Sequence, residues 1–171
     1  VNIINASKIW PIQIAGKNIT GVDETVCVLD TGVDFTHSDL IGKNKTCIID
    51  CVNKVCAENC SIGDDNSHGT HVAGIIAANN NIKGVGPGIG LIGVKVLDAG
   101  GSGNSIDLRA GMQWCIDNRA NYNISVISMS LGTTVLYENY CDNLFQTTAD
   151  IVDDADKKNI SVIAATGNEA N

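Results

Sequence analysis

The sequence predicts an α/β fold, a doubly wound parallel sheet with helices on both of its faces. Three observations lead to this prediction. Short apolar runs rich in β-branched residues alternate with longer segments of helical periodicity. The runs are almost continuously apolar, as in strands that are covered on both faces. Finally, 44% of the 171 residues are hydrophobic, enough for one sizeable core, and no repeat, low-complexity tract or domain boundary divides them.

Four apolar runs are the expected strands. They are Val26–Asp30, Leu91–Leu97, Val126–Leu131 and Ser161–Ala165. Valine and isoleucine are frequent in them, and β-branched side chains favour the extended chain. Because helical segments separate the runs, successive strands need crossover connections, and the expected sheet is parallel.

Three segments between these strands are the expected helices. They are His68–Asn80, Ser105–Ala120 and a third from about Cys141 to Lys158. Spacings of three and four place the apolar and small residues of the third segment on one helical face. The residues on that face are Leu144, Phe145, Thr148, Ile151, Val152 and Ala155. The alternation of these helices with the strands completes the α/β pattern.

The charge of the chain limits its partners. Acidic residues outnumber basic ones, and the net charge is −8 at pH 7. Nucleic acids and anionic membranes attract basic proteins, so we expect no nucleic acid and no membrane among the partners. No apolar stretch approaches the roughly 20 residues that a membrane-spanning helix requires.

Two polar residues occupy positions where enzymes place catalytic groups. Asp30 ends the first expected strand, and His68 begins the first expected helix. Chemistry in open α/β sheets gathers at the carboxyl ends of parallel strands. A carboxylate there fixes the tautomer of a neighbouring imidazole and stabilises its charged form, as in serine-type hydrolases. Gly69 lets the backbone pack closely at the helix entrance and leaves the imidazole of His68 facing the cleft. None of the serines before Asn171 lies in the sequence context of a catalytic nucleophile.

Asp30, His68 and the nearby His71 also have other interpretations. An aspartate at the end of a strand is usually a turn or cap residue. His68 and His71 share a helical face and form half of a metal site, although no third ligand is placed beside them. A metalloprotein built on these two histidines and the cysteines is therefore one alternative. We expect His71 instead to support the site or to pack in the core.

Five sequence blocks, taken in order, carry a resemblance to a known family. They are Ala6-x-x-x-Trp10, Val28–Asp34 with His37–Leu40, His68–Gly74, Val94–Gly103 with Val126–Gly132, and Ala164–Glu169. Over nearly the whole chain these blocks resemble the subtilisin-like serine proteases (subtilases). The resemblance implies that residues 1–171 are the N-terminal portion of a single subtilase catalytic domain, truncated at its C-terminus. It also implies a serine endopeptidase, which hydrolyses peptide bonds through an Asp-His-Ser triad whose serine lies beyond Asn171.

The resemblance implies roles for individual residues. Asp30 would orient His68, and His68 would act as general base and then as general acid. Asn168 would donate a hydrogen bond to the oxyanion of the tetrahedral intermediate, although a Gly-Asn pair after a strand otherwise marks a turn. The alternative function is a non-catalytic peptide-binding subunit or a pseudoprotease fragment, which retains the cleft without the nucleophile.

The expected partners are a polypeptide substrate in extended conformation and the C-terminal remainder of the same domain. The residues expected to bind substrate are Ser130, Leu131, Gly132, Gly100, Gly101, Thr166 and Gly167. The first three would offer a strand edge to the peptide, and the glycine pair at 100–101 would let a second segment approach it. The threonine at 166 would narrow the first specificity pocket, with Glu169 at its base.

Asp39 matches the carboxylate of a calcium site that many subtilases have. Calcium takes six to eight oxygen ligands. The loop Ala78–Gly84, which would supply further ligands, is shorter than in those subtilases and contains Lys83. We therefore expect the loop to be a poor source of ligands, and Asp39 is the one candidate metal ligand.

The seven cysteines are an odd number, so at least one is free or pairs outside the chain. Cys27 lies in an expected core strand and Cys115 on the apolar face of an expected helix, where a free cysteine acts as a small hydrophobe. Four others crowd one segment, namely Cys47, Cys51, Cys56 and Cys60. Their spacing suits two nested disulfides, with zinc binding and free thiols as alternatives. Disulfides predict a secreted or extracytoplasmic protein.

Overall fold

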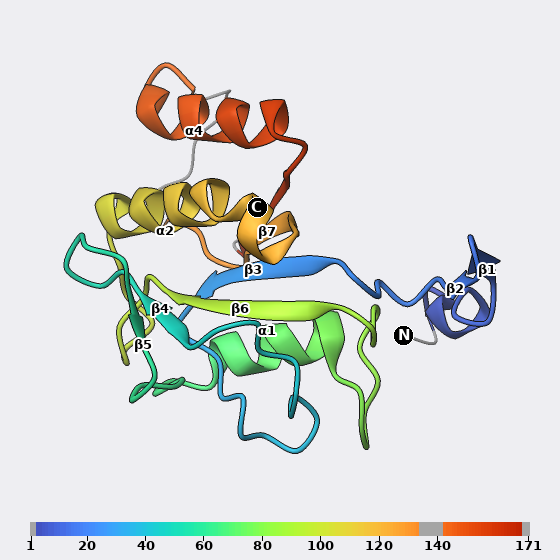
Figure 1. Cartoon of the computed structure of the whole chain (residues 1–171). Helices are drawn as coiled ribbons and strands as arrows, with labels where there is room; N and C mark the ends of the chain where they lie inside the picture. The colour runs from blue at the N-terminus through green and yellow to red at the C-terminus, as the bar shows by residue number, and fades with distance from the viewer. Residues whose placement is uncertain (1–2, 134–141, 169–171) are drawn as a thin grey trace.

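The computed structural model describes residues 3–133 and 142–168. A six-stranded sheet in the order β5-β4-β6-β3-β7-β8 forms its centre (Figure 1). The four predicted strands are all present, with ends within two residues of the prediction: β3 (Thr25–Asp30), β6 (Gly90–Lys95), β7 (Ile124–Met129) and β8 (Ser161–Ala164). All pairings among these four are parallel, which confirms the predicted sheet.

An antiparallel hairpin, which the sequence does not predict, extends this sheet on one side. Strand β4 (Ile48–Asp50) pairs in parallel with β6 and antiparallel with β5 (Ala57–Asn59). Each strand has only three residues, too few to display a period in the sequence. The N-terminal residues form a 3-10 turn, η1 (Ala6–Lys8), and a small hairpin of β1 (Gln13–Ile14) and β2 (Lys17–Asn18), which stands apart from the sheet (Figure 1).

Helices cover both faces of the sheet. Helix α1 (His68–Ala77) lies on one face, and α2 (Ser105–Asp117) lies on the other (Figure 1). Helix α2 ends three residues earlier than expected, because the Asn118 side chain donates a hydrogen bond to the Trp114 carbonyl and caps the last turn. The short helix α3 (Arg119–Tyr122) follows. No helix in the described parts of the chain is both long and apolar enough to cross a membrane.

Helix α4 (Gln146–Lys157) packs beside α2 and is shorter than the expected helix of about residues 141–158. Leu144 precedes the helix and is 71% exposed, so it is not part of the apolar face. Within the helix the expected face is confirmed, since Ala155 is fully buried and Ile151 and Val152 pack against the core. Cys141 lies outside the described residues.

Strand β3 separates two apolar layers and contributes side chains to both. Val26 and Val28 belong to the layer on the α1 side, and Cys27 and Leu29 belong to the layer on the α2 side. This division follows from the alternation of side chains along a strand. None of the four is more than 4% exposed. The burial holds the strand firmly, so the residue at its carboxyl end, Asp30, has a defined position.

Three disulfides link the described cysteines. Cys47–Cys60 and Cys51–Cys56 form the nested pair that the spacing predicts, and these bonds exclude zinc binding by the four thiols. The third disulfide corrects the expectation of two free core cysteines, because Cys27 of β3 is bonded to Cys115 of α2. Both residues are fully buried. Strand and helix face each other across one apolar layer, which brings together two cysteines that are 88 residues apart.

Candidate active site

The structure brings Asp30 and His68 into direct contact. The Nδ1 atom of His68 lies 2.8 and 3.0 Å from the two carboxylate oxygens of Asp30. The aspartate side chain is fully buried, whereas the histidine side chain is 50% exposed. Asp30 also accepts a hydrogen bond of 2.7 Å from the backbone N–H of Thr31. A buried carboxylate therefore holds one nitrogen of an imidazole whose ring is open to solvent.

Close backbone packing makes this contact feasible, as the sequence predicts for Gly69. The backbone N–H of Gly69 donates to Thr31 Oγ1 at 3.0 Å. A Cβ atom on Gly69 would lie only 2.0 Å from the carbonyl oxygen of Gly32. Any larger residue would push the start of α1 away from the end of β3 and would separate the imidazole from the carboxylate.

A cleft of about 760 Å³ lies beside His68. The predicted site residues that line it are His68, Gly100, Gly101, Ser130, Leu131, Gly132 and Asn168. They come from the start of α1, the loop after β6, the segment after β7 and the segment after β8, which all lie at the carboxyl ends of parallel strands. One hollow therefore collects polar and backbone groups from four separate parts of the chain, as expected for an open α/β sheet.

Two of the predicted substrate-binding residues lie outside this cleft. Thr166 and Gly167 are exposed and lead from β8 to Asn168, but they do not line this cleft. Glu169 lies outside the described residues. The segment at 130–132 is also not an edge strand, because β7 ends at Met129 and lies between β3 and β8. It continues past the end of an interior strand and lines the cleft from there.

Sequence reasoning missed a buried lysine beside Asp30 and His68. Lys95, at the end of β6, is 8% exposed, and its Nζ atom donates to the Thr31 carbonyl at 2.8 Å and to Asp65 Oδ1 at 2.6 Å. The signal for it was its position in an otherwise apolar strand, because a buried ammonium group needs partners. Lys95 ties the residue after Asp30 to the segment before His68.

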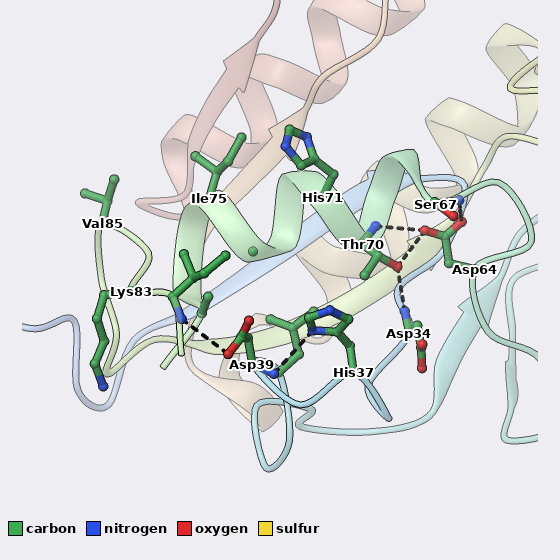
Figure 2. Close-up of a pocket in the computed structure, with 14 residues that line it drawn as sticks. Asp34, His37, Asp39, Asp64, Ser67, Thr70, His71, Ile75, Lys83 and Val85 are labelled. Carbon is green, nitrogen blue, oxygen red and sulfur yellow. Dashed lines mark hydrogen bonds between the residues drawn. The ribbon is translucent and has the colours of Figure 1, made fainter. Parts of the chain in front are cut away.

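Asp39 lies away from this cleft, beside a second cavity of about 610 Å³ (Figure 2). Its Oδ1 atom accepts hydrogen bonds from the backbone N–H groups of Asn81 (2.7 Å) and Ile82 (3.3 Å). His71 lines the same cavity and is exposed, so it does not pack in the core, while His68 lines the first cleft. Among the described residues, no three His, Cys, Asp or Glu side chains are grouped to hold a metal ion.

The residues around Asp39 do not fit a calcium ion. Lys83 donates from Nζ to the backbone oxygen (3.0 Å) and the side-chain oxygen (2.7 Å) of Asn79. Lys43 donates from Nζ to the carbonyls of Pro87 and Ile89 in the same stretch of chain. Burial lowers the pKa of Lys43, and the neighbouring positive charge of Lys83 lowers it further. The ammonium group of Lys83 thus occupies two oxygens of the loop 78–84, the segment that would have to supply further calcium ligands.

Comparison with known proteins gives the family. The model of the Subtilase family matches residues 21–171. The chain is 37% identical over 166 residues to subtilisin E of Bacillus subtilis (strain 168), an alignment that covers 95% of this chain and 39% of that protein. It is 34% identical over 171 residues to the minor extracellular protease Epr of the same organism, covering 98% of this chain and 23% of that protein.

A solved structure shows the same likeness in three dimensions. Sphericase superposes with a TM-score of 0.77 at 31% sequence identity, over 97% of this chain and 53% of that chain. The chain therefore spans about two fifths of the length of subtilisin E and about half of Sphericase. The family match over residues 21–171 and the shared fold lead to one conclusion: the chain belongs to the subtilase family.

Proposed function

We propose that the protein to which this chain belongs is a serine endopeptidase that hydrolyses peptide bonds through an Asp-His-Ser triad. The serine of the triad lies beyond Asn171. The observation that carries the proposal is the contact of 2.8 Å between the buried carboxylate of Asp30 and Nδ1 of the half-exposed His68, at the wall of a cleft. The chain order, with aspartate first and histidine second, agrees with that of subtilisin.

Each member of the site has a defined task in this mechanism. Asp30 accepts the Nδ1 proton of His68, which leaves Nε2 free to act as the base. Nε2 takes the proton of the serine hydroxyl as the serine oxygen attacks the peptide carbonyl. The proton then passes to the leaving amine, and water repeats the sequence on the acyl-enzyme. Asn168, which lines the same cleft, donates its side-chain N–H to the oxyanion.

The substrate in this proposal is a polypeptide in extended conformation. Backbone groups at Ser130–Gly132 pair with one edge of the peptide, and the turn that contains Gly100 and Gly101 approaches its other edge. That turn is well ordered by hydrogen bonds, since Asp98 Oδ1 accepts from the N–H groups of Gly100 and Ser102, both at 2.9 Å. Thr166 and Gly167 contribute to the first specificity pocket when the remainder of the domain is in place.

The C-terminal remainder of the domain is the proposed partner of an exposed apolar face. Ile163 on β8 is 58% exposed, and Ile75 on α1 is 56% exposed. Both line a hollow of about 480 Å³, together with Val26 and Val126 of the sheet. Covering this hollow would remove apolar surface from water, which stabilises the assembly by roughly 25 cal/mol per Å² of apolar area.

We also propose that the protein acts outside the cytosol. Three disulfides link six of its cysteines, and disulfides persist in oxidising compartments. The relative Epr is named an extracellular protease.

A fluorophosphonate probe tests the proposed function. The full-length protein should be labelled at one serine beyond Asn171, and the labelling rate should fall by several orders of magnitude in the variants His68→Ala and Asp30→Asn. Combining both substitutions should add little to the larger single effect, because triad members act as a unit. If the full-length protein is not labelled but still binds an extended peptide, the result would support the non-catalytic peptide-binding alternative.

A further inference from the structure

A second carboxylate, Asp64, collects five hydrogen bonds immediately before α1. Its Oδ1 atom accepts from Thr31 Oγ1 (2.7 Å), from the N–H of Asn66 (3.1 Å) and from the N–H of Ser67 (2.9 Å). Its Oδ2 atom accepts from the N–H (2.8 Å) and the Oγ1 hydroxyl (2.6 Å) of Thr70. Figure 2 shows Asp64 beside the first turn of α1, with the bonds to Thr70 dashed.

The two threonine hydroxyls extend this network in a fixed direction. A hydroxyl has a single proton, and both Thr31 and Thr70 donate theirs to Asp64. Their lone pairs are therefore free to accept, and they accept from the backbone N–H groups of Gly69 (3.0 Å) and Asp34 (2.9 Å), respectively. The hydroxyls can keep donating in this direction only if both side-chain oxygens of residue 64 accept hydrogen bonds.

The network joins the two segments that carry the catalytic pair. Thr31 follows Asp30 directly, and Ser67 and Gly69 flank His68. We propose that Asp64 is a positioning residue, which acts through Thr31 and Thr70 to hold the start of α1 against the end of β3 so that His68 stays within hydrogen-bonding reach of Asp30. This inference rests on the proposed protease function and adds a residue to its machinery.

Two features of the same region agree with this role. Ser67, which precedes His68, has a φ of +83°, a conformation that costs energy for a residue other than glycine. Its N–H is held by Asp64. Burial of Asp64 favours its neutral form, but hydrogen bonds from Thr70 and Thr31 outweigh that effect and lower the pKa to about 2. The acceptor is therefore ionised throughout the neutral range.

The test uses the full-length protein and the variant Asp64→Asn. The amide offers one acceptor and one donor, so it cannot accept at both ends of the network. We expect kcat to fall about 10–100-fold with KM within about twofold, because a small misplacement of catalytic groups costs up to ~10²-fold. The downfield proton resonance of the bond between His68 Nδ1 and Asp30, visible in the parent at low temperature, should be lost or shifted.

The control is Asp107→Asn. Asp107 is 3% exposed and accepts from the N–H groups of Asn53 (3.4 Å) and Lys54 (2.8 Å) and from the Asn104 side chain (2.7 Å). It is thus a matched buried acceptor that does not line the cleft and bonds to neither Asp30 nor His68. This variant should lose stability while it retains kcat and the downfield resonance. An equal fall in kcat in both variants would overturn the positioning role and leave a structural one.

A second pair of variants decides the question if Asp64→Asn does not fold. Thr70→Val removes the hydroxyl and should lower kcat, whereas Thr70→Ser retains it and should restore most of the loss. Equal kcat values in the two variants would contradict the inference. Failure of the proposed function itself looks different, because the parent protein would then show neither hydrolysis nor reaction with fluorophosphonate.

Discussion

Lys95 is the cross-strand partner of Asp30 in the parallel pair of β6 and β3, and its ammonium group donates to the carbonyl of the next residue, Thr31. The cation therefore fixes the backbone at the point where the chain leaves β3. Its second bond, to Asp65 (2.6 Å), reaches the segment that leads into α1. A buried charge thus takes part in the geometry of the site through the backbone next to Asp30.

The variant Lys95→Met tests this relationship. It leaves the Thr31 carbonyl without its donor, so we expect the free energy of unfolding to fall by about 1–3 kcal/mol. Urea denaturation of the full-length protein measures the loss. Asp65→Asn is the control, because the neutral amide oxygen still accepts from Lys95 and should preserve most of the stability. A larger loss in Asp65→Asn than in Lys95→Met would show that the ion pair, and not the carbonyl bond, is the important contact.

The contacts around Asp39 predict that calcium does not bind there. A single substitution at Asp39 tests this prediction, because other metal sites affect the parent and the variant equally. We expect Asp39→Asn to lower the melting temperature by the same amount in millimolar calcium and in EDTA. If Asp39 did bind calcium, the ion would stabilise the parent protein by RT ln(1 + [Ca²⁺]/Kd). The substitution would then lose this stabilisation in calcium but not in EDTA. A substitution cost that grows with calcium concentration would therefore restore Asp39 as a metal ligand.

Acid should remove the contribution of Asp64 to stability. The pKa of this carboxyl falls from 3.8 to about 2 on folding, so the unfolded state binds more protons than the native state between these values. The contribution is then complete above about pH 4 and disappears as the pH falls through about 2. Unfolding free energies of the parent and of Asp64→Asn, measured from pH 5 to pH 2, should converge at the acid end. Parallel curves would contradict the lowered pKa.

The disulfides should differ in their effect on stability. Cys27–Cys115 closes a loop of 88 residues and Cys51–Cys56 a loop of five. In the chain-entropy description the long loop contributes about 4–5 kcal/mol and the short one about 2 kcal/mol. Replacing each pair by alanines and comparing unfolding free energies tests the difference. Equal losses would mean that local strain or packing, and not loop length, sets the effect of these bonds.

The sequence predicts the strands, the placement of Asp30 beside His68 and the nested disulfides because each depends on local information. Asp30 and His68 lie in distinctive short motifs at the end of an apolar run and at the start of a helical one. The bond between Cys27 and Cys115 depends on which helix covers which face of β3, and this appears only when strand order is known.

Asp64 and Lys95 escaped prediction for a related reason. Two adjacent aspartates precede His68, and nothing in the letters shows that the first turns toward the threonines and the second toward a lysine. The short β4–β5 hairpin was missed because its strands lie among cysteines and polar residues. Long-range partners decide each of these features.

The strand order has a consequence for synthesis. Strand β3 lies between β6 and β7, and both partners come later in the chain, at residues 90–95 and 124–129. Strand β3, which is buried at every residue in the folded protein, therefore leaves the ribosome with two unpaired edges and remains so until at least 60 further residues have followed. Open apolar edges are the usual points of misassociation in nascent proteins. Correct folding of this chain thus requires that β3 stays free of other pairings until β6 and β7 have been synthesised.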